Sequence, residues 1–280
     1  MSELLARTRE ICKMFEIKPA RSKGQNFLIN EKIYDDIIKA ANINKQDIVL
    51  EVGPGLGFLT AKLSKVAGRV IAVELDDQLA NYLQMAVDAQ DLENVEIINQ
   101  DILKLNLANY IPSGKTFKVV ANLPYNITSI FLRSYLSASY KPESMTLMLQ
   151  KEVAERIVAT PPDMSLLAVS VQCYCEPEII REVKAGNFWP EPEIDSCVIK
   201  FNIKPKLVSE DDKIFFRLVR SGFSSKRKML KNNLAAGLKM KSSELEKEII
   251  KLGLDPKIRA EQLSLENWRK LVAAFSSFVV

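Results

Sequence analysis

The sequence predicts an α/β protein: a doubly wound, Rossmann-like sheet followed by a small all-helical domain. Three observations predict this fold. Short apolar runs alternate with amphipathic segments between residues 31 and 157. A glycine-rich turn follows the first of these runs, and only helical patterns occur beyond residue 206. Alternation of this kind is typical of parallel strands joined by crossover helices.

Each element is predicted from its periodicity. Residues 1–30 form a polar, basic lead-in, and residues 31–41 carry apolar side chains at positions 33, 37, 38 and 41, the helical period. Apolar runs predict strands at 48–52, 70–74, 95–98, 118–121 and 145–149. Helical patterns lie at 59–66, 77–87, 130–138 and 153–157. A helix at 166–174 and late strands at 179–183 and 197–203 complete this part of the chain.

The last third of the chain contains a proline-rich segment, a linker and four helices. Phe188-Trp189-Pro190-Glu191-Pro192 predicts an ordered loop, because proline fixes extended or turn backbone. Lys204-Pro205-Lys206 predicts a linker. Helical patterns follow near 211–221, 226–236, 243–252 and 264–277. We therefore predict two domains, residues 1–206 (with 1–30 as an N-terminal segment) and residues 207–280.

The composition is that of a soluble protein, with 47% hydrophobic and 26% charged residues among 280. No apolar run reaches the roughly 18–20 residues that span a bilayer. The N-terminus lacks the apolar segment of a signal peptide. We therefore expect a cytoplasmic protein that has no membrane partner.

Two residue types limit the possible chemistry. The cysteines at positions 12, 173, 175 and 197 have neither disulfide nor zinc-site spacing. The chain contains no histidine. This absence excludes catalysis by Ser-His-Asp or Cys-His groups and every metal site that needs a histidine ligand. We expect no metal.

The charge is distributed unevenly. Residues 205–280 contain 16 Lys and Arg but 9 Asp and Glu, a net charge of +7, whereas residues 1–204 carry −3. A basic domain beside a mildly acidic one indicates a polyanionic partner, most simply a nucleic acid. The alternative is a solvated helical face without a partner.

The run at 48–52 is followed by Gly53, Gly55 and Gly57 and then by a helical pattern, which is the layout of a cofactor-binding turn. Glycine lets the backbone approach a ligand closely. The dinucleotide pattern G-x-G-x-x-G would need glycine at position 58 or 60, where the chain has Phe58 and Thr60. The pattern E-x-G-x-G-x-G that begins at Glu51 instead looks like the first motif of methyltransferases that use S-adenosylmethionine.

Two acidic residues follow later strands. Glu74 ends the second run, 21 residues after Gly53, where a carboxylate can accept hydrogen bonds from both ribose hydroxyls. Asp101 follows the third run, where it can accept a bond from the adenine amino group. The alternative is that each carboxylate only caps a following helix.

Asn122-Leu123-Pro124-Tyr125 ends the run at 118–121, which places it at the carboxyl edge of the sheet, near the cofactor crevice. An aromatic amino group is a poor nucleophile, because its lone pair is delocalised into the ring. The Asn122 side-chain oxygen and the Leu123 carbonyl could accept its two N–H bonds and stabilise the charge that develops on nitrogen. Pro124 would fix this turn, and Tyr125 would stack on the base. An Asx-type turn that starts a helix is the alternative.

Together these motifs resemble the family of ribosomal RNA adenine N6,N6-dimethyltransferases, most closely its small-subunit branch. The resemblance runs nearly from end to end and includes, besides the residues above, Lys23-Gly24-Gln25-Asn26-Phe27-Leu28, Glu74-Leu75-Asp76, Gln100-Asp101, Phe188–Pro192 with Asp195-Ser196, Phe223-x-x-Lys226-Arg227-Lys228-x-Leu230, and Arg259-Ala260-Glu261 leading to Trp268. It implies a seven-stranded class I methyltransferase sheet and S-adenosylmethionine as cofactor. It also implies methylation of two adjacent adenosines in a hairpin near the 3′ end of 16S rRNA, within a small-subunit precursor.

The resemblance also implies roles for individual residues. Those expected to bind the cofactor are Gln25, Asn26, Leu28, Gly53, Gly55, Glu74, Asp101, Ile102 and Asn122. Those expected to hold the adenine are Asn122, Leu123, Pro124, Tyr125 and Phe188, of which Phe188 could equally pack in the core. RNA phosphates are expected on Lys226, Arg227, Lys228 and Lys231. A common variant of the family has histidine where this chain has Asn26, which can donate a hydrogen bond to the cofactor carboxylate but carries no charge.

Three other functions fit part of the pattern. An antibiotic-resistance relative that dimethylates 23S rRNA shares the motifs around the cofactor, but the Phe188–Pro192 segment and the tail to Trp268 favour the small-subunit branch. DNA adenine methyltransferases usually have aspartate where this chain has Asn122. The third is an RNA-binding assembly factor that retains a cofactor site. We expect a monomer, because no apolar stripe in the sequence demands a dimer.

Overall fold

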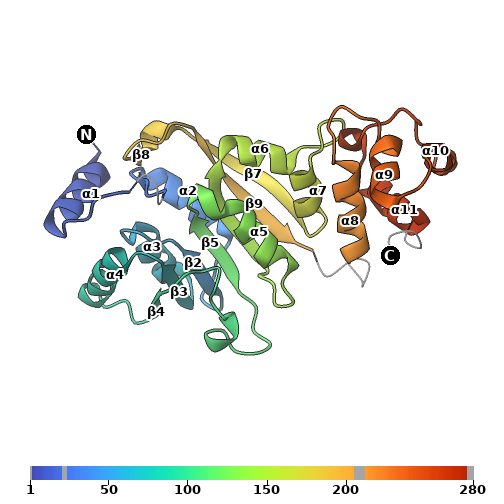
Figure 1. The fold of residues 1–280 in the computed structure, drawn as a ribbon. Coiled ribbons are helices and arrows are strands. Elements are labelled where there is room, and N and C mark those ends of the chain that lie inside the picture. The colour runs from blue at the N-terminus through green and yellow to red at the C-terminus, as the bar shows by residue number, and fades with distance from the viewer. Residues whose placement is uncertain (1, 21–23, 205–211, 276–280) are drawn as a thin grey trace. The chain divides into compact units, whose positions relative to one another are not determined.

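Among the residues that the computed structural model describes (2–20, 24–204 and 212–275), seven strands form one sheet in the order β4-β3-β2-β5-β6-β9-β7 (Figure 1). The strands from β4 to β6 pair in parallel, and β9 runs antiparallel to β6. The α/β class, the mostly parallel sheet and the seven strands are thereby confirmed. The strands are β2 Ile48–Val52, β3 Arg69–Glu74, β4 Val95–Asn99, β5 Lys118–Asn122, β6 Ser144–Gln150, β7 Cys175–Val183 and β9 Ser196–Ile203.

Helices follow most of the strands, and polar side chains begin several of them. Asn30 accepts the Lys32 N–H at the start of α2, and Asp76 accepts two N–H groups at the start of α4. The helices are α1 Glu3–Met14, α2 Glu31–Ala41, α3 Phe58–Val66, α4 Asp77–Ala89, α5 Thr128–Ser137, α6 Lys151–Val158, α7 Leu166–Gln172, α8 Asp212–Gly222, α9 Leu230–Leu238, α10 Ser242–Lys251 and α11 Leu265–Phe275. Short 3-10 helices lie at Leu107–Asn109, Tyr125–Ile127, Ala185–Asn187 and Ala260–Gln262.

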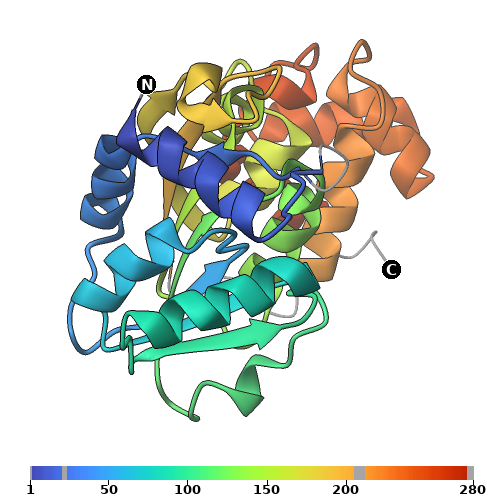
Figure 2. The ribbon, with the colours of Figure 1, turned by 90° about the vertical axis from the view of Figure 1, so that its left-hand side faces the viewer.

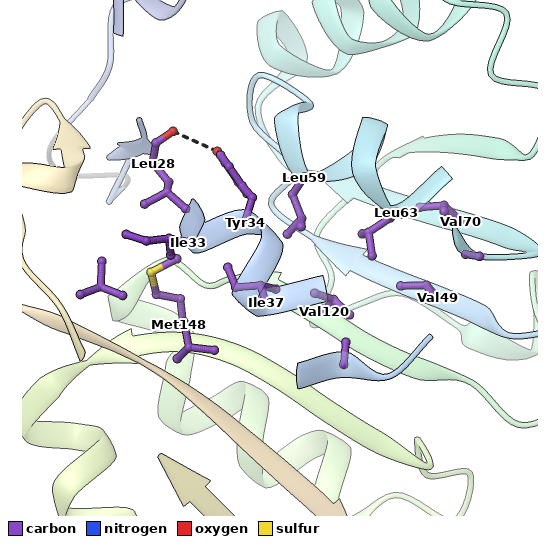
Figure 3. Packing of buried hydrophobic residues seen from close by; sticks show 14 of the residues in the cluster. Leu28, Ile33, Tyr34, Ile37, Val49, Leu59, Leu63, Val70, Val120 and Met148 are labelled. Atoms are coloured by element: carbon purple, nitrogen blue, oxygen red, sulfur yellow. Dashed lines mark hydrogen bonds between the residues drawn. The ribbon is translucent and has the colours of Figure 1, made fainter. Parts of the chain in front are cut away.

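One face of the sheet packs against α2 and α3, as Figure 3 shows. The buried side chains of this layer come from both helices and from four strands: Ile33, Ile37, Leu59, Leu63, Val49, Val70, Val120 and Met148. Farther along the same sheet, α4 lies alongside β4 (Figure 2) and packs Leu83 and Val87 against it. Side chains alternate between the faces of a strand. Glu51 therefore shares the face of Val49 and points toward the layer of α2 and α3.

The N-terminal region differs from its prediction as a lead-in. Residues 3–14 form helix α1, which buries Leu4, Thr8 and Cys12 at a spacing of four. Phe27–Leu28 forms a short strand, β1, that pairs antiparallel with β8, Phe188–Trp189. The prediction of a loop without an element at Phe188–Pro192 is therefore wrong at its first two residues. The Tyr34 hydroxyl donates to the Leu28 carbonyl at 3.0 Å and fixes β1 on α2 (Figure 3).

Contacts divide the chain into two compact units. The first contains Met1–Ala154 and Pro177–Ile203, and the second contains Glu155–Glu176 and Lys204–Val280. The second unit thus includes α7, which the sequence assigned to the first domain. In this unit Tyr174 stacks on Phe216 with ring centroids 5.8 Å apart. The predicted boundary after residue 206, with Pro205 and Lys206 of the linker, lies outside the described residues.

No helix in the described part of the chain is long and apolar enough to cross a membrane. The four cysteines are all described, and they are buried and form no disulfide.

Candidate active site

The glycine turn and Asn122-Leu123-Pro124-Tyr125 lie side by side because β2 and β5 are parallel neighbours. Val52 pairs with Ala121, so both strands end at the same level of the sheet. A Cβ atom on Gly53 would lie 3.7 Å from Cδ of Pro124 and 3.8 Å from the Asn122 carbonyl oxygen. The sheet thus brings together the two motifs on which the predicted function depends.

The glycine turn is held in a conformation that also fixes the carboxyl group of Glu74. Gly53 and Gly55 have φ values of +66° and +57°, which favour glycine. The Gly55 N–H donates to Glu74 Oε2 at 3.1 Å, and the Asp76 N–H donates to Oε1 at 3.0 Å. Burial raises the pKa of Glu74, and these two hydrogen bonds oppose the rise. The carboxyl group is therefore oriented before any ligand binds.

The N-terminal segment connects the turn after β3 with the loop after β5. The Gln25 side chain accepts the Ala20 N–H at 2.8 Å and donates to Asp76 Oδ2 at 3.3 Å. On the other side, Asn122 Nδ2 donates to the Asn26 carbonyl at 3.4 Å. The predicted motif around Gln25 and Asn26 therefore lies where the two sheet loops meet.

These segments enclose a cavity of about 120 Å³. Seven of the predicted cofactor residues line it: Gln25, Asn26, Leu28, Gly53, Gly55, Glu74 and Asn122. Its described lining includes Glu51, Glu74 and Asp76 but no lysine or arginine. S-adenosylmethionine carries a sulfonium, an ammonium and one carboxylate, so its net charge is positive and suits an acidic lining. The same lining repels the phosphates of a dinucleotide.

Glu51 is a second indication of a cationic ligand. Its side chain is 1% exposed, and neither carboxyl oxygen has a hydrogen-bond partner among the described residues. Buried carboxyl groups are normally hydrogen-bonded or paired. An acidic group without a partner beside this cavity fits a ligand that supplies N–H donors.

Asp101 and Ile102 do not line this cavity. Asp101 Oδ1 accepts the Leu103 N–H at 2.9 Å, and Ile102 lines a separate cavity of about 560 Å³ beside Tyr135. The end of β4 is nevertheless tied to Glu74, because Asn99 Nδ2 and the Gln100 N–H both donate to the Glu74 carbonyl at 3.0 Å. The expected contacts of Asp101 with the adenine and of Ile102 with the cofactor stay predictions.

The loop after β5 adjoins a further cavity of about 330 Å³. Tyr125, Asn126 and Gln150 line it, together with Gly24 and Asn26, which also line the first cavity. The Tyr125 hydroxyl lies 2.7 Å from Ser196 Oγ, which fixes the ring, and burial raises the pKa of this tyrosine. Two cavities that share lining residues could hold a methyl donor and an acceptor base.

Leu123 and Phe188 are both buried, at 1% and 3% exposure. Phe188 pairs with Leu28 across the two short strands and belongs to the core cluster on α2. It lines neither cavity beside Asn122. In this structure Phe188 packs in the core, and its contact with adenine stays a prediction.

The basic residues expected to contact RNA do not all lie on a helix, although the sequence predicted a helix at 226–236. Lys226, Arg227 and Lys228 are exposed on a turn, because α9 begins only at Leu230. Lys231 lies on α9, where its Nζ atom is 2.9 Å from Glu246.

Contacts from buried side chains fix the turn at Lys226–Lys228. The buried Asn233 side chain donates to the carbonyls of Gly222 at 2.6 Å and Ser225 at 2.9 Å. Phe223 stacks on Trp268 with ring centroids 5.6 Å apart. The structure thus presents three exposed cations on a fixed turn.

The sequence predicted no role for the Tyr34 hydroxyl, the Asp76 side chain or the ionisation of Glu51. For Glu51 a signal was available, because it is the one charged residue in the apolar run Ile48–Val52. A carboxyl group on an interior strand is costly and often functional. Tyr34 and Asp76 gave no such signal, because their partners Leu28 and Gln25 are identified only by the fold.

The chain is similar to known proteins over nearly its whole length. The family model for ribosomal RNA adenine dimethylase matches residues 17–276. The ribosomal RNA small subunit methyltransferase A of Dehalococcoides mccartyi (strain CBDB1) is 42% identical over 275 residues, covering 98% of this chain and 94% of that protein. The protein of the same name from Clostridium acetobutylicum is 39% identical over 268 residues, covering 94% and 96%.

Two solved structures are similar over most of the chain. A dimethyladenosine transferase from Plasmodium falciparum has a TM-score of 0.79 and 28% identity, covering 91% of this chain and 98% of that one. The 23S rRNA methyltransferase ErmE has a TM-score of 0.73 and 26% identity, covering 90% and 100%.

We expect Glu74→Ala to weaken binding of S-adenosylhomocysteine by roughly 10- to 100-fold, because hydrogen bonds to a charged group contribute about 1.5–3 kcal/mol. Isothermal titration calorimetry gives the dissociation constant. Glu152→Ala, which changes an exposed glutamate on α6, serves as the matched control. An unchanged affinity in Glu74→Ala would place the ribose contact elsewhere.

Proposed function

The chain belongs to the ribosomal RNA adenine dimethylase family, and we propose that its substrate is a pair of adjacent adenosines in the 3′-terminal hairpin of 16S rRNA. As a member of this family it is an S-adenosylmethionine-dependent methyltransferase that forms N6,N6-dimethyladenosine in ribosomal RNA. We further propose that it acts in the cytoplasm as a monomer, on a precursor of the small ribosomal subunit.

The choice of subunit is supported by the sequence relatives. The proteins that are 42% and 39% identical over nearly their whole length are named for the small subunit. The 23S rRNA methyltransferase ErmE shares the fold but only 26% of the residues. This difference in sequence identity is the observation that supports a target in the small subunit. The two adjacent adenosines and their hairpin rest on the motif resemblance.

S-adenosylmethionine supplies an electrophilic methyl group on a sulfonium. In our proposal its ribose hydroxyls bind Glu74, whose carboxyl group is held by the N–H groups of Gly55 and Asp76. Gln25, Asn26 and Leu28 bind the amino-acid end, and Asp101 and Ile102 bind the adenine. The acidic lining of the cavity favours this cation over an anionic cofactor.

The target adenine enters the cavity beside Tyr125, which shares Gly24 and Asn26 with the cofactor cavity. The Asn122 side-chain oxygen and the Leu123 carbonyl accept the two N–H bonds of its amino group. These bonds favour a pyramidal nitrogen whose lone pair points at the methyl group. They also stabilise the positive charge that grows on nitrogen during transfer. Pro124 fixes the turn, Tyr125 stacks on the base, and Phe188 supports it from the core side.

The reaction needs no strong general base, because the cationic amine formed by transfer loses its proton readily to water. The absence of histidine from the chain is consistent with this chemistry. A second transfer to the same nitrogen requires exchange of the spent cofactor, and the one N–H that remains on the monomethylated amino group can donate to only one of the two acceptors, Asn122 or Leu123.

RNA binding in this proposal uses the exposed turn of Lys226, Arg227 and Lys228. Phosphate contacts give affinity and orientation but little sequence choice. The choice of adenosine would then come from the folded rRNA, whose unpaired bases can be splayed out of their loop into the pocket.

The proposal is tested by methyl transfer from radiolabelled S-adenosylmethionine to unmethylated 30S subunits, with the label mapped by primer extension. Label on two neighbouring adenosines near the 16S 3′ end is expected. Label on 23S rRNA instead would keep the chemistry and overturn the substrate. A lack of label on both RNAs would leave a cofactor-binding RNA protein without this activity.

We expect Asn122→Ala to lower the single-turnover rate of methyl transfer by roughly 10²- to 10³-fold, the usual cost of removing a transition-state acceptor or donor. Binding of S-adenosylhomocysteine, measured by calorimetry, should persist. Asn106→Ala changes an exposed asparagine outside both cavities and should keep the full rate. A rate loss below tenfold in Asn122→Ala would contradict the proposed clamp.

Reversal of Lys226, Arg227 and Lys228 to Glu should weaken 30S binding and flatten its dependence on salt. The slope of log K against log [salt] should fall by roughly 0.7–0.9 for each phosphate that the variant no longer neutralises. Filter binding at several salt concentrations measures this slope. A variant with Lys241, Lys247 and Lys257 reversed has the same net charge and controls for it. Equal slopes in the two variants would show that the turn makes no special contact with RNA.

A further inference from the structure

Gln150 is the last residue of β6 and lines the cavity of about 330 Å³ beside Tyr125. In the proposed function this cavity receives the target adenine. Gln150 is half-buried, and its side-chain amide forms no hydrogen bond with any residue that the structure describes. Amide groups withdrawn from bulk water normally have hydrogen-bond partners. An unused amide that lines a substrate cavity is therefore placed to contact the substrate.

The register of the sheet places Gln150 close to the Tyr125 hydroxyl. Gln150 pairs directly with Ser196 of β9, and the Cβ atoms of such a pair lie about 4.5–5.5 Å apart on one face of the sheet. Ser196 Oγ in turn lies 2.7 Å from the Tyr125 hydroxyl. Met148 packs in the layer of α2 (Figure 3), and Gln150, two residues later, lies on the same face. The Gln150 amide thus lies beside the ring that is expected to stack on the base.

The proposed clamp leaves the ring nitrogens of adenine without hydrogen-bond donors. In that proposal both N–H bonds of the amino group go to Asn122 and Leu123. The two ring nitrogens that flank the amino group, N1 and N7, can only accept hydrogen bonds. A base that leaves its stack and enters a pocket loses the water or the base partner that satisfied these atoms. Because a buried acceptor without a partner destabilises the complex, the pocket needs a donor for it.

The cavity offers few side-chain donors. In the described part of its lining, the side-chain amides are those of Asn26, Asn126 and Gln150, and the two glutamates only accept hydrogen bonds when ionised. The Asn26 amide is directed to a neighbouring carbonyl oxygen at 3.5 Å, and this residue is expected to bind the cofactor. Asn126 is exposed to solvent. Gln150 combines a half-buried position on a strand with an unused amide, so it is the donor that fits best.

We propose that Gln150 is a further substrate-binding residue, whose side-chain amide donates a hydrogen bond to a ring nitrogen that flanks the amino group of the target adenine. The contact holds the base in the orientation in which its amino group meets Asn122 and Leu123. The inference rests on the adenine pocket of the proposed function, and it is independent of which ribosomal RNA carries the target.

Two substitutions separate a donor from a packing role. Gln150→Glu keeps the shape of the side chain, but at neutral pH it has no donor and brings a negative charge to the ring nitrogen. Gln150→Met removes the donor without adding a charge. We expect Gln150→Met to lower the single-turnover rate of methyl transfer by roughly 5- to 100-fold, the cost of an unsatisfied buried acceptor, and Gln150→Glu to lower it further. The substrate is the ribosomal subunit that the wild-type protein methylates. Binding of S-adenosylhomocysteine, measured by calorimetry, should be unchanged in both variants.

Gln46→Met is the matched control, because Gln46 is exposed just before β2, at the opposite end of the strand from the glycine turn, and it should keep the full rate. A normal rate in Gln150→Glu would overturn the proposal, since packing needs only the shape of the side chain. Weakened binding of S-adenosylhomocysteine in both variants would also overturn it, because a damaged fold would then account for the loss. A loss in Asn126→Met together with normal rates in both Gln150 variants would assign the contact to Asn126 instead. Wild-type protein that methylates neither ribosomal RNA would refute the proposed function itself, and this inference with it.

Discussion

The parallel pairing of β2 with β5 is the constraint on which the rest of the site depends. From β2 the chain builds the sheet outward through β3 and β4, then returns to place β5 on the other side of β2. The two strands therefore send their following loops in opposite directions, which opens a crevice at their carboxyl ends. Gly53 and Pro124 face each other across it, and the N-terminal segment around Asn26 closes it. In our proposal a methyl donor and an amino group meet in this crevice.

The crevice destabilises the folded state, because it buries two acidic side chains. Glu51 and Glu74 are both buried, and burial raises the pKa of each carboxyl group. Glu74 is partly compensated by two backbone N–H groups, whereas the two carboxyl oxygens of Glu51 lack a hydrogen-bond partner among the described residues. Acidic groups whose pKa is raised by burial in a cavity are typical of functional sites. In our proposal a cationic cofactor completes this acidic pocket, and its charge favours it over a dinucleotide.

The sequence predicted the sheet well because its strands are apolar and regularly spaced, as in the run that ends at Val52. It missed α1, because only Leu4 among the residues buried on that helix is strongly apolar, while Thr8 and Cys12 are weak signals. It missed the strand at Phe188 because its partner Leu28 lies far away in the chain. The helix predicted from residue 226 begins too early, because Lys226–Lys228 fit a helical period although they form a turn before α9.

The candidate site shows the same division. Motif spacing predicted that Glu74 and Asn122 belong together, and the fold brings both to one cavity. Spacing could not show that Phe188 packs in the core or that Lys231 is paired with Glu246, because both depend on contacts between distant residues.

The most direct measurement of where the cofactor binds is a crystal structure of the protein with bound S-adenosylhomocysteine. We expect the ligand in the cavity between the glycine turn and the N-terminal segment, with its ribose at Glu74 and its sulfur toward Asn122. A ligand seated in another cavity, or turned with its adenine at Asn122, would contradict it.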